Sequence, residues 1–229
     1  MSAPAPTAAP PVSTQRMIGV LGTVALVSGL LVVTAYELTL PQIEENRRIA
    51  IERAIATVYP EAKTRRAYRV TPERLALTTE AVPSGQVIYA VFDSGGKFLG
   101  VAAQAAARGY QDVVRLLYAY SPECQCITAI HVLANRDTPG IGDKIAKDRQ
   151  FLENFRALDV RLAPDGRTLA NPIVTVKHGT KVEAWQIDAI SGATITSKAV
   201  GKALNDSAQT VVPRVTAELQ VIAHPEIRP

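Results

Sequence analysis

Four hydroxyl side chains surround a Gly-Ala pair in the stretch DAISGATITSKAV, residues 188–200. They belong to Ser191, Thr194, Thr196 and Ser197, and the pair is Gly192 and Ala193. A helix start needs one such hydroxyl as its N-cap, after a tight turn at the glycine. A helix N-terminus also favours a phosphate, because it presents free N–H groups and the positive end of the dipole. A hydroxyl beside that phosphate could be esterified by it, so these residues alone leave a cap and a reaction site both open.

A second candidate is the loop DTPGIGDK, residues 137–144. Pro139 restricts its own φ, whereas Gly140 and Gly142 allow backbone shapes and close approaches that a Cβ would prevent. Such a rigid, thin loop could lie flat against a planar ligand. The alternative is a tight strand-to-helix turn with Asp143 near the start of the helix.

The surrounding segments predict the elements that position these loops. Residues 86–105 are two apolar runs around a Ser-Gly-Gly turn, the pattern of a β-hairpin. Residues 126–134 and 171–188 add strand-like stretches, the latter turning near His178 and Gly179. Residues 144–160 have the spacing of an amphipathic helix, and a last helix begins at the hydroxyl cluster. Hairpin strands mixed with a few helices predict an α+β domain with a largely antiparallel sheet and flanking helices.

The N-terminal part predicts a membrane anchor. Residues 1–16 are rich in Ala, Pro, Ser and Thr and predict a disordered tail. Residues 17–36 are uncharged and apolar, and about 20 residues suffice for a transmembrane helix. A signal peptide has a shorter apolar region of about 7–15 residues, which favours an uncleaved anchor. Residues 37–63 predict a connecting helix, and residues 64–229 predict the folded domain.

Charge and cysteine content exclude several classes of function. The net charge of +4 is mild and its charges are interspersed, so we expect no nucleic-acid partner. We expect no metal site, since a tetrahedral site needs about four ligands and Cys124 and Cys126 stand without a second pair or a histidine cluster. The two cysteines are interpreted as free thiols at a strand edge. Dinucleotide and P-loop folds are also disfavoured, because the glycine patterns that they require are missing.

Both loops resemble motifs of the FMN-binding domain family. SGATITS is similar to the family's flavinylation motif, Ser/Thr-Gly-Ala-Thr/Ser-x-Thr/Ser, in which a flavin transferase links FMN through its phosphate to the last hydroxyl. That position is Thr196 here. The loop TPGIGD resembles the family's Thr-Pro-Gly-Leu-Gly-Asp element, with Asp137 where a glutamate is usual and Ile141 where a leucine is usual. The order of anchor, helix, hairpin and two loops resembles the G subunits of Rnf electron-transport complexes.

The resemblance implies a covalent FMN in residues 64–229 and a role for each motif residue. Thr196 would carry the phosphoester, with Ser191, Gly192, Ala193 and Thr194 shaping the turn around the phosphate and Lys198 as its neighbour. The ring or its linker would contact the second loop at Thr138, Pro139, Gly140 and Gly142.

The resemblance also implies an assembly. The chain would relay electrons in a ferredoxin:NAD oxidoreductase complex coupled to Na⁺ or H⁺ transport, with the other Rnf subunits (A, B, C, D and E) as partners and a flavin transferase for maturation. Arg16 precedes the apolar run, so the positive-inside rule places the N-terminus in the cytoplasm and the domain in the periplasm, with one pass through the inner membrane. Two alternatives remain: the C subunit of a Na⁺-translocating NADH:quinone reductase, and a membrane-anchored assembly module without flavin, in which both loops are only turns.

Overall fold

The computed structural model describes residues 13–71, 74–78 and 85–223. The chain divides into two compact units, residues 1–46 and residues 47–229. Residues 1–12 of the predicted tail lie outside the described residues, and the first helix already begins at Thr14. The end of the predicted tail is therefore helical.

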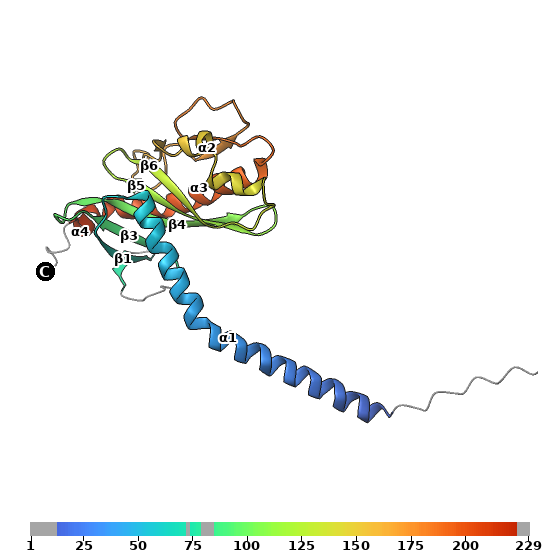
Figure 1. Ribbon diagram of the computed structural model, residues 1–229. Helices are drawn as coiled ribbons and strands as arrows, with labels where there is room; N and C mark the ends of the chain where they lie inside the picture. The colour runs from blue at the N-terminus through green and yellow to red at the C-terminus, as the bar shows by residue number, and fades with distance from the viewer. Residues whose placement is uncertain (1–12, 72–73, 79–84, 224–229) are drawn as a thin grey trace, which may run out of the picture. The chain divides into compact units, whose positions relative to one another are not determined.

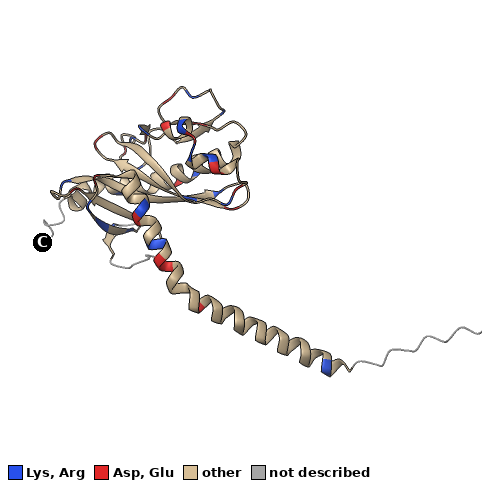
Figure 2. Ribbon diagram, viewed as in Figure 1, with Lys and Arg blue, Asp and Glu red and all other residues tan. Residues whose placement is uncertain are grey.

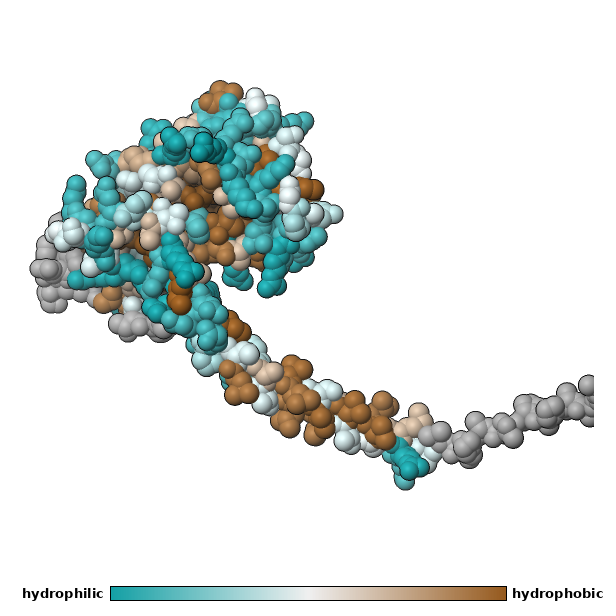
Figure 3. All heavy atoms as spheres, viewed as in Figure 1, coloured by the Kyte–Doolittle hydropathy of each residue, from teal (hydrophilic) through white to brown (hydrophobic). Residues whose placement is uncertain are grey.

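Helix α1, Thr14–Val58, contains the apolar run. It is the one helix in the described part of the chain that is long and apolar enough to cross a membrane. No charged residue occurs between Arg16 and Glu37, and the side chains along this stretch are exposed and mostly apolar (Figures 2 and 3). The helix continues through Pro41 and ends two residues before Pro60, where the ring of a proline disfavours a helical residue before it. The predicted span and connecting helix are thus parts of one helix.

The unit formed by residues 47–229 is built on a seven-stranded antiparallel sheet of order β2-β1-β3-β4-β5-β6-β7 (Figure 1). The strands of this sheet are β1 Thr64–Val70, β2 Leu75–Leu77, β3 Val87–Phe92, β4 Phe98–Arg108, β5 Val113–Ser121, β6 Cys126–Ala134 and β7 Leu158–Asp159. The remaining elements are η1 Gly142–Ala146, α2 Arg149–Glu153, β8 Val174–Val176, β9 Gln186–Asp188, α3 Thr194–Ala217 and α4 Leu219–Ala223. An antiparallel sheet with flanking helices confirms the predicted α+β class.

Both faces of the sheet are covered. Every residue of β3 is buried, and alternate side chains belong to two different hydrophobic clusters, as expected when successive side chains of a strand point to opposite faces. One cluster includes the last turns of α1, through Ile51, Ala54, Ile55 and Val58. These residues stand at i, i+3, i+4 and i+7, so they form a single helical stripe.

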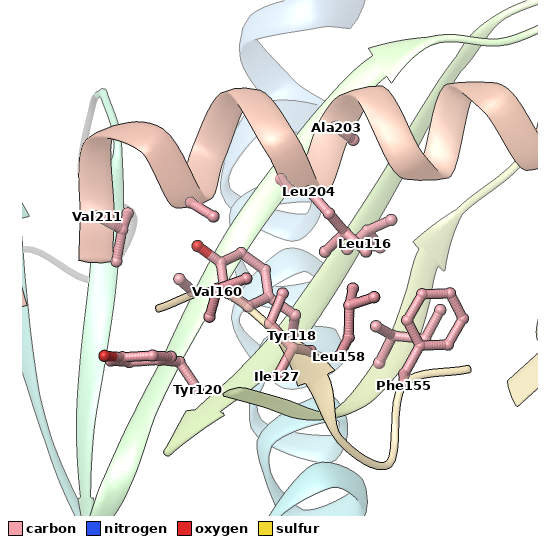
Figure 4. Close-up of a cluster of buried hydrophobic side chains, with 14 of the residues drawn as sticks. Leu116, Tyr118, Tyr120, Ile127, Phe155, Leu158, Val160, Ala203, Leu204 and Val211 are labelled. Atoms are coloured by element: carbon pink, nitrogen blue, oxygen red, sulfur yellow. The ribbon is translucent and has the colours of Figure 1, made fainter. Parts of the chain in front are cut away.

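Helix α3 covers the other face and contributes most of its core. It packs on β4 and β5, and its buried side chains include Ala203, Leu204 and Val211. Figure 4 shows Leu204 above Leu116, in a cluster that also includes residues from β5, β6 and β7. Burial of this helix face holds the N-terminus of α3 in place relative to the sheet.

Two expectations about the elements need correction. The stretch 171–188 does form two strands, but β8 and β9 pair in parallel as a separate sheet. The predicted helix over 144–160 is broken into η1 and α2, because the Asp148 side chain accepts a hydrogen bond from Phe151 N and begins a new helix. In addition, strands β1, β2, β5 and β7 were not predicted, although β5 lies between β4 and β6 in the sheet.

The interpretation of Cys124 and Cys126 as free thiols is wrong. The two residues are joined by a disulfide in the turn between β5 and β6. Gln125 between them has a φ of 51°, and the two Cα atoms lie 5.2 Å apart, within the usual range for a disulfide. The left-handed backbone at Gln125 is thus what brings the two sulfur atoms together.

The core under α3 generates a stability prediction. Leu204 is fully buried, so Leu204→Ala removes packed methyl groups and leaves a cavity, at a cost of about 2–5 kcal/mol. We expect the thermal midpoint of the full chain in detergent, followed by circular dichroism, to fall by roughly 5–15 °C.

The matched control is Lys202→Ala on the exposed side of the same helix, which breaks only the exposed pair with Asp206 and should cost less than about 1 kcal/mol. Equal midpoints for Leu204→Ala and Lys202→Ala would contradict the packing described here.

Candidate functional site

The two loops singled out in the sequence meet at one cavity of about 440 Å³. Its volume falls within the range of about 300–1,000 Å³ typical of small-molecule sites. The lining residues come from the turn between β4 and β5, the loop after β6 and the start of α3: Tyr110, Asp137, Thr138, Ile141, Gly142, Gly192, Ala193, Thr194, Ile195 and Thr196.

A hydrogen bond joins the two loops inside this cavity. Thr196 Oγ1 donates to Asp137 Oδ2 at 2.7 Å, and both residues are buried. Thr196 is the third residue of α3, and Asp137 follows β6, 59 positions earlier in the chain. The buried hydroxyl is therefore held in one orientation at a helix N-terminus.

Backbone N–H groups of the turn between β4 and β5 hold the Asp137 carboxylate. Oδ1 accepts a hydrogen bond from Gln111 N at 2.9 Å, and Oδ2 accepts one from Tyr110 N at 3.3 Å. The Asn135 side chain bridges two points of the loop. Its Oδ1 accepts a hydrogen bond from Asp137 N at 2.9 Å, and its Nδ2 donates one to Gly142 O at 2.8 Å. The carboxylate is thus fixed by the β4–β5 turn, its own loop and α3.

Gly142 is required by close packing. A Cβ at this position would collide with the Cβ of Asp137, so any larger residue would displace the carboxylate or the loop. Gly109 approaches from the other side, where an added Cβ would lie 2.8 Å from Asp137 Oδ2. The carboxylate therefore has little freedom to move away from Thr196.

These hydrogen bonds also determine the protonation of Asp137. Burial opposes its ionisation, but hydrogen bonds from the Thr196 hydroxyl and from the backbone N–H groups of Gln111 and Tyr110 outweigh that cost and hold the pKa of Asp137 below its ordinary value. Asp137 is consequently a carboxylate at neutral pH and can accept a hydrogen bond or a proton.

The start of α3 differs from a hydroxyl cap. The N-cap residue is Ala193, whose side chain makes no cap hydrogen bond. Ser197 instead closes the turn from within: its Oγ accepts from Ile190 N at 3.1 Å and donates to Ala193 O at 2.9 Å. Gly192 has a φ of 82°, a conformation that favours glycine in this turn. Because Ser197 makes the hydrogen bonds that stabilise the turn, the Thr196 hydroxyl is not needed for that purpose.

The first N–H groups of α3 are available to a ligand. The first hydrogen bond of the helix runs from Ser197 N to Ala193 O at 2.9 Å, and the three N–H groups before it have no acceptor within the helix. They belong to Thr194, Ile195 and Thr196, which all line the cavity. Together with the dipole of a 24-residue helix, they suit an anion such as a phosphate.

The structure brings six of the ten predicted site residues together around the cavity: Thr138, Gly142, Gly192, Ala193, Thr194 and Thr196. The other four are absent from its lining. Ser191 lines a neighbouring polar cavity of about 250 Å³ with His178 and Asp188, while Pro139, Gly140 and Lys198 are exposed. The predicted roles of all ten remain predictions.

Four lining residues were not predicted as site residues: Tyr110, Asp137, Ile141 and Ile195. Asp137 and Ile141 belong to the loop DTPGIGDK, and Ile195 belongs to the motif SGATITS. Their places in these motifs could have predicted them as site residues. Tyr110 comes from the β4–β5 turn, and no pattern in the sequence connects that turn to either motif. The apolar side chains of Ile141 and Ile195 suit a flat, apolar ring beside the polar helix start.

The match to a known family agrees with this geometry. Residues 109–209 match the sequence model of the family described as FMN-binding domain. The matched segment contains all of the residues that line the cavity. The fold and the site therefore define a protein with an FMN-binding domain, and a cavity that offers an apolar wall, a hydroxyl and a helix N-terminus fits FMN.

Relatives that match most of the chain define the family further. The chain is 30% identical over 184 residues to the G subunit of the ion-translocating oxidoreductase complex of Cereibacter sphaeroides, covering 79% of this chain and 76% of the relative. It is 27% identical over 189 residues to the protein of the same name from Aliivibrio fischeri, covering 81% and 84%. The chain belongs to the family of the G subunits of these complexes, the Rnf complexes.

The chain also matches, over a shorter stretch, a relative whose name states the ion that its complex transports. The G subunit of the proton-translocating ferredoxin:NAD(+) oxidoreductase complex of Clostridium ljungdahlii is 32% identical over 117 residues, covering 51% of this chain and 56% of the relative. The chain thus spans little more than half the length of this relative.

Solved structures support the fold. The crystal structure of Shewanella oneidensis NqrC has a TM-score of 0.57 at 17% identity, covering 78% of this chain and 98% of that one. The C subunit of the Na(+)-translocating NADH-quinone reductase from Parabacteroides distasonis has a TM-score of 0.59 at 19% identity, covering 76% and 92%. At such low identities the likeness shows a shared fold and nothing more.

The lowered pKa of Asp137 generates a pH prediction. An unfolded aspartate has a pKa of about 3.9, so the ionised carboxylate stabilises the folded state above that pH, and the contribution is lost as the pH falls through the lower folded pKa. We expect the full chain to be more stable than Asp137→Asn at pH 7, and this advantage to shrink steadily below about pH 4.

The check is a series of thermal midpoints from pH 7 to pH 2.5. Other carboxylates with lowered pKa values, such as Asp159, are present in both proteins and cancel in the difference. A difference that stays constant over the whole range would contradict the prediction.

Proposed function

We propose that the chain carries FMN as a phosphodiester on the Thr196 hydroxyl and serves as an electron-carrying subunit of an ion-translocating ferredoxin:NAD oxidoreductase complex. The observation that carries this proposal is the convergence of both motif loops on one cavity, with the Thr196 hydroxyl at the N-terminus of α3. The bound flavin would supply the redox chemistry, since a cofactor of this kind accepts and donates the electrons itself.

The residues of the chain would then attach and orient the group. The N–H groups at the start of α3 would bind the phosphate, and Gly192 and Ala193 would form the turn that allows its approach. Thr138, Pro139, Gly140 and Gly142 are proposed to contact the ring or its linker. Ser191 would shape the turn. Lys198, which is exposed and lies two residues after Thr196 in α3, would add positive charge near the phosphate.

A covalent bond suits a carrier outside the cytoplasm. FMN that dissociated outside the cytoplasm could not be replaced from the cytoplasmic pool. A phosphodiester bond prevents that loss. The disulfide between Cys124 and Cys126 supports this location, because disulfides persist in oxidising compartments such as the periplasm. We therefore propose that α1 crosses the inner membrane once, with the N-terminus in the cytoplasm and the domain in the periplasm.

The partners follow from the family. We propose that the chain assembles with the other Rnf subunits (A, B, C, D and E) and that a flavin transferase attaches its FMN. The coupling ion is Na⁺ or H⁺, and the names of its relatives include both: proton-translocating in Clostridium ljungdahlii and Na(+)-translocating in Acetobacterium woodii. The alternative of a quinone reductase C subunit is disfavoured, because the sequence relatives described above are G subunits and the likeness to C subunits lies in the fold.

The test is the intact mass of the full chain purified from cells that contain the flavin transferase. We expect a mass increase equal to FMN less one water, and we expect it to vanish in Thr196→Val, which keeps the shape of the side chain but has no hydroxyl. The matched control is Thr194→Val, which removes an exposed hydroxyl two positions earlier in the same motif and should still carry the adduct.

Two outcomes would count against the proposal. Wild-type chain without an adduct would remove the covalent claim, whereas an adduct that persists in Thr196→Val and is lost in Thr194→Val would move the attachment site. A thermal midpoint for each variant shows whether it is folded, since Thr196→Val leaves Asp137 without one of its donors and should cost about 1–3 kcal/mol.

A further inference from the structure

We propose that Asp137 is the general base for the flavinylation of Thr196 in the same chain. It accepts the proton of the Thr196 hydroxyl while that oxygen attacks the flavin phosphate. The proposal rests on the covalent attachment proposed above and adds a catalytic residue that belongs to the acceptor chain. A flavin transferase would then supply the activated flavin, and the acceptor would supply both the nucleophile and its base.

The geometry of the reacting pair carries the proposal. The distance of 2.7 Å from Thr196 Oγ1 to Asp137 Oδ2 lies within the range of about 2.6–3.2 Å required of a general base. Both residues line the cavity, so the same open space that would admit a phosphate touches the nucleophile and the carboxylate. Asp137 is the one carboxylate among the described residues of this lining.

The surroundings keep Asp137 fixed and charged in the way a base requires. The carboxylate accepts hydrogen bonds from neutral donors, including the Thr196 hydroxyl and the N–H groups of Tyr110 and Gln111. These donors leave its negative charge uncancelled, and the packing of Gly142 and Gly109 against it restricts its movement. The carboxylate thus polarises the hydroxyl before any donor arrives.

The same loop could serve structure alone, and that alternative predicts something different. In a purely structural role, the two carboxylate oxygens serve only to accept the hydrogen bonds from the hydroxyl and from the backbone N–H groups. Asp137→Asn would then lose stability, because the amide NH2 group cannot accept a hydrogen bond, but the variant that remains folded would still load at the wild-type rate. If Asp137 is the base, the folded variant loads slowly.

The chemical step balances with an activated flavin nucleotide as co-reactant. Ester formation from a phosphate requires a leaving group, so we take the donor to be a flavin pyrophosphate diester such as flavin adenine dinucleotide. The Thr196 Oγ–P bond forms, the P–O bond of the pyrophosphate breaks, and a nucleoside monophosphate leaves. The hydroxyl proton passes to Asp137 Oδ2 and from there to solvent, as it does to the catalytic aspartate of protein kinases. No electrons are transferred.

The start of α3 would assist this step from the opposite side. Negative charge on the phosphate next to the Asp137 carboxylate is unfavourable, but Thr194, Ile195 and Thr196, whose N–H groups have no acceptor within the helix, line the same cavity. They would offset this repulsion and orient the phosphorus toward Thr196 Oγ1.

The experiment measures the rate of loading. Full chain without flavin, prepared from cells that lack the transferase, is mixed in detergent with purified flavin transferase and flavin adenine dinucleotide, and adduct formation is followed by intact mass. We expect Asp137→Asn to load at least about 100-fold more slowly than the wild type, since a general base contributes roughly 10²–10⁴-fold. Asp206→Asn, an exposed carboxylate on α3, should load at the wild-type rate.

The outcomes separate this proposal from the one on which it rests. Wild-type chain that gains no adduct defeats the covalent attachment itself. Wild-type chain that loads, together with folded Asp137→Asn loading within threefold of it, overturns only the role of Asp137.

A second variant covers the case in which Asp137→Asn is slow because its fold is damaged. In Asp137→Ala, added formate can occupy the space of the missing carboxylate and accept the proton. Loading that rises several-fold with formate, but not with an equal concentration of chloride, supports the base. Absence of this rescue overturns it.

Discussion

The burial of one side of helix α3 against the sheet is the contact on which the rest of the molecule's chemistry depends. The helix is continuous from Thr194 to Ala217, and its buried face includes Leu204 and Val211. A rigid helix that is fixed along its length also has a fixed end. The hydrophobic core therefore positions the backbone of Thr196, and the loops have only to orient its hydroxyl.

Asp137 connects this core-fixed helix to the loops. Its carboxylate receives hydrogen bonds from α3 and from the β4–β5 turn, through Thr196, Gln111 and Tyr110. A buried charge is costly unless such donors surround it, so the loops adopt the arrangement that supplies them. The interaction that orders the site is thus also the one that orients its hydroxyl, and stability and reactivity are linked through one side chain.

Much of the fold could be predicted from the sequence, and the failures have definite causes. The hairpin of β3 and β4, the apolar part of α1 and the helix α3 each have a clear periodicity or turn signal. Strand β5 is buried on both faces through residues 116–120, so it lacks the alternation that marks a half-exposed strand. The disulfide depends on the backbone conformation of Gln125, and the break before α2 depends on whether the Asp148 side chain turns back to the backbone. At the site, the residue types made both loops candidates and the family resemblance favoured a binding role for them, but the link between the loops was not predictable. Asp137 and Thr196 stand 59 residues apart, and only the packing of α3 shows that they touch.

The exposed side chains at the cavity mouth have a consequence for the protein before it is loaded. Tyr110 is 63% exposed, Ile195 54% and Ile141 47%, and all three line the same opening. A patch of apolar surface that is not covered by its ligand makes a protein prone to self-association and to capture by chaperones. A flavin in the cavity would cover part of this patch, so loaded and unloaded chains should differ in colloidal behaviour as well as in colour.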